Sequence, residues 1–154
     1  MEFIIFLNKL DKDIFELIKK VNYSIEENSA LCLIDKRYVG FHKRREKKII
    51  ICTENVKKLT NFTNKLISKS KDNHKTKLYI RRALRHEATH MAQSCNNGQP
   101  TGMIKNLKSK IHKNKLNAMK KSVRISGNLF REYEAYVMED KPIKVKRAIE
   151  KYCL

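Results

Sequence analysis

Two histidines four residues apart, His86 and His90, lie in a long segment that has helical periodicity and contains neither glycine nor proline. Its apolar residues recur at three- and four-residue spacings, so that on a helix they form one continuous stripe: Ile80, Leu84, Ala88, Met91 and Cys95. The two histidines lie beside this stripe, one turn apart on the same face. We therefore predict a helix over 76–95, ended near Gly98, that packs on one flank and presents two imidazoles on another.

The residue after the first histidine is Glu87, so the sequence reads HExxH over residues 86–90. Two imidazoles at this spacing can bind one zinc ion. A glutamate beside the metal can act as general base, taking a proton from a water that zinc activates and passing it to a leaving amine. Catalytic zinc usually has three protein ligands, so another residue must supply the third.

The third ligand is expected to be a carboxylate or His112, because the glycine and histidine that extend HExxH in metzincins are absent. Segment 131–136 contains two glutamates. On a helix Glu134 would have apolar neighbours one turn away on both sides, and a metal would offset the cost of burying its charge. Glu132 would lie on a more polar flank. We predict Glu134 as the ligand and Glu132 as second choice; the alternative is that both are solvated.

The positive charge of the chain is large, with 35 Lys and Arg against 16 Asp and Glu and a formal net charge of +19. Such a charge attracts anionic partners, here nucleic acid or an acidic protein. An A/T-rich coding bias is an equally good explanation, because most of the charge is lysine spread along the chain. The densest basic segment, between Lys105 and Arg124, contains no aromatic residue on which bases could stack. At most it would bind phosphates.

The whole pattern predicts an α+β fold in a single domain over 1–154, mostly helical, with a small antiparallel sheet before the HExxH helix. Residues 1–29 are expected to form an N-terminal extension of one strand and one helix, the helix capped by Asp11. The other expected elements are a polar break at 26–29, a hairpin of strands 30–39 and 48–52 around a basic tip, and helices over 53–67, 104–111, 128–139 and 143–152.

The cysteines show no CxxC pairing, and we interpret Cys52 and Cys95 as core residues, not as ligands or disulfide partners. No apolar run approaches the roughly 20 residues that a membrane span needs. The first residues lack the features of a signal peptide. These observations predict an intracellular protein in a reducing compartment, without a membrane span.

The motifs resemble those of small gluzincin metallopeptidases, which combine HExxH on one helix with a glutamate on a later helix. The Glu134-Ala135 dipeptide is similar to the pattern around the gluzincin glutamate ligand, and residues 86–93 resemble an HExxHxxQ run of several compact peptidase-like proteins. The resemblance implies a zincin-like fold, a zinc cofactor and hydrolysis of peptide bonds in a protein or peptide substrate. Gluzincins also carry an acidic residue four positions after the ligand, where this chain has Met138.

Two further roles follow from this interpretation. Gluzincins pair their substrate with a strand at the rim of the active site, which assigns Ile50, Ile51 and Cys52 to substrate binding. The developing oxyanion needs a donor besides the metal, and the candidates are Tyr133, Tyr136 and His112.

Two other functions remain as alternatives. In one, the chain is a basic nucleic-acid-binding protein in which HExxH is structural or accidental, which predicts salt-sensitive binding and no stoichiometric metal. In the other, zinc serves stability alone.

Overall fold

The computed structural model describes residues 1–62, 73–106 and 113–154. Helices and a small sheet make up the described part, so the predicted α+β class is confirmed. The elements are the 3-10 helices η1 (Glu2–Phe6) and η2 (Ala30–Leu33), the strands β1 (Ser24–Glu27), β2 (Gly40–Lys43) and β3 (Lys48–Ile51), and the helices α1 (Lys9–Lys20), α2 (Thr53–Leu59), α3 (His74–Cys95), α4 (Lys113–Ser126), α5 (Leu129–Met138) and α6 (Pro142–Tyr152).

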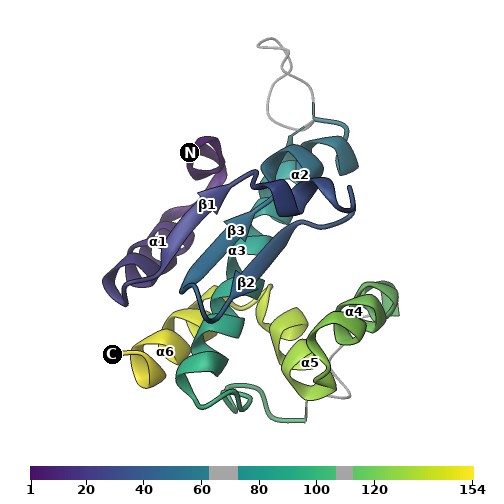
Figure 1. Cartoon of the computed structure of the whole chain (residues 1–154). Coiled ribbons are helices and arrows are strands. Elements are labelled where there is room, and N and C mark those ends of the chain that lie inside the picture. The colour runs from purple at the N-terminus through teal and green to yellow at the C-terminus, as the bar shows by residue number, and fades with distance from the viewer. Residues whose placement is uncertain (63–72, 107–112) are drawn as a thin grey trace.

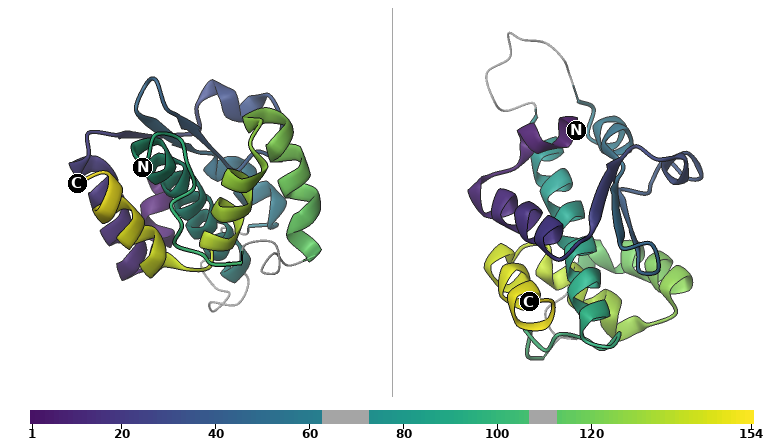
Figure 2. Two further views of the ribbon diagram at one scale, coloured as in Figure 1. Left: turned by 90° about the horizontal axis from the view of Figure 1, so that it is seen from below. Right: turned by 60° about the vertical axis from the view of Figure 1, so that its left-hand side comes forward.

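Helix α3 passes through the middle of the molecule, with the sheet on one side of it (Figures 1 and 2). It contacts α1, α2, α5 and α6 as well as β2 and β3. The predicted stripe is buried on this helix, since Ile80, Leu84, Ala88 and Met91 are all 0% exposed. The helix ends at Cys95 as predicted. The stretch after it contains consecutive residues with positive φ, one of which is Gly98. The two histidines therefore lie on the most extensively packed element of the fold.

The sheet has three strands in the order β1-β3-β2, with β1 parallel and β2 antiparallel to β3 (Figure 1). A hairpin precedes α3 as predicted and its second strand is β3, but its first strand is β2, which lies in the segment predicted as the basic tip and not at 30–39. The sheet as a whole is mixed and not purely antiparallel, because β1 adds a parallel strand. As the middle strand, β3 has Ile49, Ile50 and Ile51 at no more than 1% exposure.

The N-terminal segment differs from the prediction in three places. Residues 3–7, expected as a strand, lie mostly in the 3-10 helix η1. The N-cap of α1 is Asn8, whose side chain accepts a hydrogen bond from the Asp11 backbone N–H at 3.0 Å. Part of the expected polar break at 26–29 belongs to strand β1, because its four residues pair with β3 in parallel register.

The segment 30–39, expected as a strand, forms η2 and a turn instead. One side chain organises this loop: the Asn55 amide donates hydrogen bonds to the backbone carbonyls of Cys32, Asp35 and Tyr38. Side-chain amides that bind local carbonyls in this way compete with the pairing of a strand. The β-branched and apolar composition of the segment did not reveal this interaction.

The four cysteines form two disulfides, Cys32–Cys52 and Cys95–Cys153. The expectation that the cysteines form no disulfide framework is therefore wrong, whereas Cys52 is buried in the core as predicted. The partners lie 20 and 58 residues apart in sequence, so the fold brings them together and no local spacing indicates it. Disulfides persist in oxidising compartments, which argues against the reducing compartment expected from the sequence.

The last two helices follow the predicted elements closely, whereas α4 lies in a segment for which no helix is predicted. The helices expected at 128–139 and 143–152 are α5 and α6, each within one residue of the predicted ends. Helix α2 ends at Leu59, and most of the remaining span predicted for it falls outside the described residues, as does most of the helix expected at 104–111. No helix among the described residues is long and apolar enough to cross a bilayer.

Candidate metal centre

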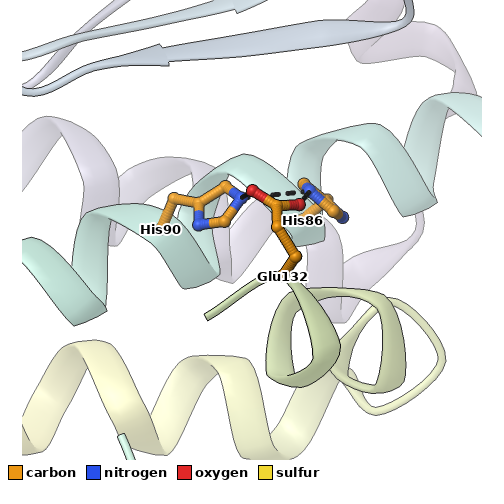
Figure 3. A group of neighbouring side chains, drawn as sticks. All are labelled: His86, His90 and Glu132. Carbon is orange, nitrogen blue, oxygen red and sulfur yellow. Dashed lines mark hydrogen bonds and ion pairs between the residues drawn. The ribbon is translucent and has the colours of Figure 1, made fainter. Parts of the chain in front are cut away.

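Three side chains from two helices meet at one point: His86 and His90 of α3 and Glu132 of α5 (Figure 3). Their ligand atoms lie within 4.8 Å of one another. The Nε2 atoms of the two histidines are 3.1 Å apart, and the Glu132 oxygens lie 3.3 Å from His90 Nε2 and 3.5 Å from His86 Nε2. All three residues are buried. Two imidazoles and one carboxylate form a donor set typical of catalytic zinc.

Local helix geometry explains the convergence. The four-residue spacing places His86 and His90 one turn apart on α3. Helix α5 is capped by Asn128, whose side chain accepts a hydrogen bond from the Arg131 backbone N–H at 3.1 Å. Glu132 then lies in the first turn of α5, and α5 packs on α3.

The carboxylate of this cluster is Glu132, the second choice of the sequence analysis, and not Glu134. Two residues along a helix turn a side chain by about 200°, so both cannot face the same point. Glu134 is 0% exposed and accepts hydrogen bonds from the Thr101 backbone N–H (2.6 Å), the Thr101 hydroxyl (2.8 Å) and the Gln93 amide (3.0 Å). Glu134 is buried as expected, but hydrogen bonds, and not a metal, offset the cost of burying its charge.

The other nitrogen of each imidazole has its own partner. His86 Nδ1 lies 3.0 Å from Glu139 Oε1, and His90 Nδ1 lies 2.8 Å from Gln93 Oε1. A carboxylate and an amide oxygen are acceptors, so each imidazole donates its Nδ1–H. Both Nε2 atoms, the nitrogens left for a metal, consequently point into the cluster. No partner of either histidine is predicted from the sequence.

The cluster favours a positive charge at this point, which is a proton when no metal is bound. Two imidazole nitrogens and a carboxylate converge, and apart from its ion pair with His86 Nε2 at 3.5 Å, Glu132 Oε2 has no hydrogen-bond partner among the described residues. Burial lowers the pKa of His86, but its hydrogen bonds to Glu132 and Glu139 outweigh burial and raise that pKa to about 10. Burial raises the pKa of Glu132, and the hydrogen bonds from both histidines more than reverse this and lower it. A divalent cation at this point would satisfy the same groups, so the residues fit a zinc ion.

Glu87 lies next to the cluster and against strand β2. A methyl group built on Gly40 would come 2.9 Å from Glu87 Cγ and 3.1 Å from the Ile50 carbonyl oxygen, so only a glycine leaves room for this carboxylate. Burial raises the pKa of Glu87, and the charges of His86 and His90 partly oppose this. A buried carboxyl with a raised pKa suits a general base that must also give its proton away.

The strand beside the cluster is β2, which corrects the assignment of Ile50, Ile51 and Cys52 to the rim. Those residues are buried in and just after the middle strand. Strand β2 lies at the edge of the sheet and contacts α3. The Cys52 N–H donates to the Val39 carbonyl at 3.0 Å, and hydrogen-bonded pairs alternate along an antiparallel ladder. The backbone groups of Gly40 and His42 therefore face the outer edge.

Of the predicted oxyanion donors that the structure describes, Tyr133 and Tyr136, the second lies beside the cluster. Its ring centroid is 4.6 Å from that of His86, and its hydroxyl is 2.9 Å from Ser122 Oγ. Burial raises the pKa of Tyr136, so the hydroxyl keeps its proton. No hydrogen bond or ring contact within the described ranges joins Tyr133 to the cluster, and His112 falls outside those ranges.

His42 is a neighbour of the cluster that the sequence analysis missed. It projects from β2, its ring centroid lies 6.3 Å from that of His90, and it stacks on Tyr23 at 5.7 Å. Burial, helped by the charges of His90, Arg131 and Arg44, lowers the pKa of His42 to about 3, so the imidazole is neutral. A single histidine in a basic strand gives no signal of this position in the sequence.

The basic segment between Lys105 and Arg124 is described only in part. Lys115 does not present a free charge there, because its Nζ lies 2.6 Å from Glu139 Oε2 and 3.1 Å from Asp140 Oδ2. This lysine thus holds the carboxylate that orients His86. Lys115, one of the lysines in the segment expected to bind phosphates at most, is thus already paired with two carboxylates beside the metal centre.

The model of one protein family, described as "Domain of unknown function (DUF8637)", matches residues 3–154. No curated protein and no solved structure matches the chain.

Proposed function

We propose that this chain, which belongs to the DUF8637 family, is a zinc-dependent peptidase. One observation carries the proposal: the Nε2 atoms of two imidazoles point inward and meet a buried carboxylate, directly beside a second buried carboxyl. His86, His90 and Glu132 would hold the metal. Glu87 would be the general base.

Zinc held by such a donor set would polarise the substrate carbonyl and lower the pKa of a water molecule. That water can then be deprotonated and attack the carbonyl carbon. Glu87 takes the proton of the attacking water and returns it to the leaving amine, for which its raised pKa is suited. Tyr136 and neutral His42 are the hydrogen-bond donors nearest the cluster for the developing oxyanion. Glu139 and Gln93 keep both imidazoles oriented while the proton moves.

The substrate would bind as an additional strand on β2. The outward backbone groups of Gly40 and His42 can pair with an extended peptide, which holds it without demanding particular side chains. Glu87 contacts the same strand at Gly40. A peptide paired here would therefore pass the general base. This edge replaces the one we expected at Ile50–Cys52.

The net charge of +19 supports a second candidate, an anionic partner. If nucleic acid is that partner, binding must weaken steeply with salt and must survive removal of the metal. The two disulfides support action in an oxidising compartment, in place of the intracellular one expected earlier.

The proposal is tested with an unstructured protein substrate and three forms of the chain: wild type, Glu87→Gln and His90→Ala. The wild type must cut the substrate and contain one zinc per chain. Glu87→Gln must keep the zinc and lose turnover, whereas His90→Ala must lose both. Zinc without turnover in the wild type would leave a structural metal site, and salt-sensitive nucleic-acid binding with no metal would favour the rival function.

A further inference from the structure

We infer that Glu134 is a positioning residue for the metal centre: it fixes the side-chain amide of Gln93, and through it the protonated nitrogen of His90. The inference rests on the proposed metal site. Glu134 touches neither the metal ligands nor Glu87 by any hydrogen bond in the described chain. Its effect would pass through one intermediate side chain.

The first step is the fixed orientation of Gln93, which is 0% exposed. Its Nε2 donates to Glu134 Oε2 at 3.0 Å and to the Arg131 carbonyl oxygen at 3.0 Å. Neither a carboxylate nor a carbonyl can donate in return. If the amide were flipped, its oxygen would face two other oxygens in a buried place, and these acceptors would lose their donor. Glu134 therefore allows only one orientation.

The second step passes from Gln93 to His90. With Nε2 turned to Glu134, the amide oxygen faces His90 Nδ1 at 2.8 Å and Arg131 Nε at 3.4 Å. An amide oxygen only accepts, so His90 must carry its proton on Nδ1. Its Nε2, which lies 3.1 Å from that of His86 and 3.3 Å from Glu132 Oε1, is then the nitrogen left for the metal. Metal binding through Nε2 requires this proton on Nδ1.

Glu134 is itself held in place from outside the site. The Thr101 backbone N–H and hydroxyl donate to it at 2.6 and 2.8 Å, and the Tyr152 hydroxyl donates to the Thr101 carbonyl at 2.7 Å. The turn after α3 and the end of α6 thereby hold the Glu134 carboxylate in place. The same carboxylate accepts the hydrogen bond of the Gln93 amide, which contacts the metal ligand His90.

The test measures zinc affinity with a competing chelator and, in zinc-free protein, the protonation of His90 Nδ1 from ¹⁵N shifts of the imidazole. Glu134→Met removes the acceptor and should weaken zinc binding about tenfold, the lower end for partners of metal ligands, with Nδ1 protonated in only part of the molecules. Glu134→Gln keeps an oxygen toward Gln93 and should retain wild-type affinity and a fully protonated Nδ1. Gln93→Leu should reproduce the Glu134→Met result, and the double variant should add nothing to it.

Glu27→Met is the matched control. Like Glu134, Glu27 accepts three hydrogen bonds, but it lies on β1. The donors are the backbone N–H groups of Glu2 and Phe3 and the hydroxyl of Thr53. Loss of the Glu27 carboxylate should lower stability and leave zinc affinity and the protonation of His90 Nδ1 unchanged.

Wild-type affinity and a fully protonated His90 Nδ1 in Glu134→Met would overturn the inference. So would a wild-type His90 that lacks a proton on Nδ1, a result that needs no variant to fold. If the wild type bound no zinc, the proposed function would fail, while the Nδ1 measurement in zinc-free protein would still decide the role of Glu134.

Discussion

Arg85 and Asp11 form a buried ion pair that joins α3 to α1, with Arg85 Nε 2.6 Å from Asp11 Oδ1 and Nη2 3.0 Å from Oδ2. Arg85 also donates from Nη1 to the Glu139 carbonyl at 2.9 Å. One guanidinium thus connects the N-terminal helix to the residue that orients His86. The pair explains why residues before the sheet belong to the same core as the metal centre.

Replacing Asp11 with alanine should leave the Arg85 charge buried and unpaired. We expect the free energy of unfolding to fall by about 3–5 kcal/mol, measured by urea titration. The matched control is Glu16→Ala, which removes an exposed pair with Lys19 on the same helix and should cost no more than about 1 kcal/mol. Equal losses in the two variants would contradict the structural role of the buried pair.

Gly40→Ala should displace the general base without removing a metal ligand. The new methyl group would meet the Glu87 side chain and the Ile50 carbonyl oxygen, and the strand cannot yield easily on both sides. We expect turnover to fall by about 10- to 100-fold, the range for a misplacement near 1 Å, while zinc content stays at the wild-type level. Lys43→Ala on the same strand serves as control. Unchanged turnover in Gly40→Ala would place Glu87 outside the reaction.

His42 predicts a pH dependence of stability. Its pKa is lowered to about 3 in the folded chain, against an ordinary value of about 6.5 when unfolded. The contribution of neutral His42 to the free energy of unfolding is therefore complete above about pH 6.5. It is lost as the pH falls toward 3, because the unfolded chain binds a proton at His42 more readily than the folded chain does. Unfolding titrations of wild type and His42→Gln should show the wild type losing its advantage over that interval.

The comparison variant for this measurement is His74→Gln, at an exposed position of α3. A wild-type slope that His42→Gln leaves intact would mean that His42 is not neutral beside His90.

Removing the Cys95–Cys153 disulfide should destabilise the chain, since it ties the end of α3 to the end of α6. We expect Cys95→Ala with Cys153→Ala to lower the free energy of unfolding by about 2–5 kcal/mol. A reducing agent should then shift the wild type toward the variant and affect the variant less. If reduction left wild-type stability unchanged, the disulfide would contribute nothing to the fold.

Local patterns predicted the central helix well, because its apolar stripe is read directly from the spacing and its C-terminus is marked by Gly98. The choice between Glu132 and Glu134 could not be made in this way. Periodicity indicates that a face is buried but not what it faces, and both carboxylates are buried, one by His86 and His90 and the other by Thr101 and Gln93.

Non-local contacts account for the other errors. Strand β1 (Ser24–Glu27) is short and polar and exists because β3 lies beside it, so on its own it suggests a break. Its addition turns β3 from an edge into the middle strand, which moved the expected substrate strand to β2. The Cys32–Cys52 disulfide and the Asn55 amide likewise act on segment 30–39 from about 20 residues away.

The ligand set of the metal is the central claim, and X-ray absorption of the zinc-loaded protein tests it most directly. Wild type and Glu134→Gln should both bind one zinc per chain, with two imidazole nitrogens and a carboxylate oxygen at about 2.0–2.2 Å. Glu132→Gln should bind zinc at least tenfold more weakly and lose the carboxylate oxygen. Full zinc binding with unchanged coordination in Glu132→Gln, or loss of the carboxylate oxygen in Glu134→Gln, would contradict the site described for this chain.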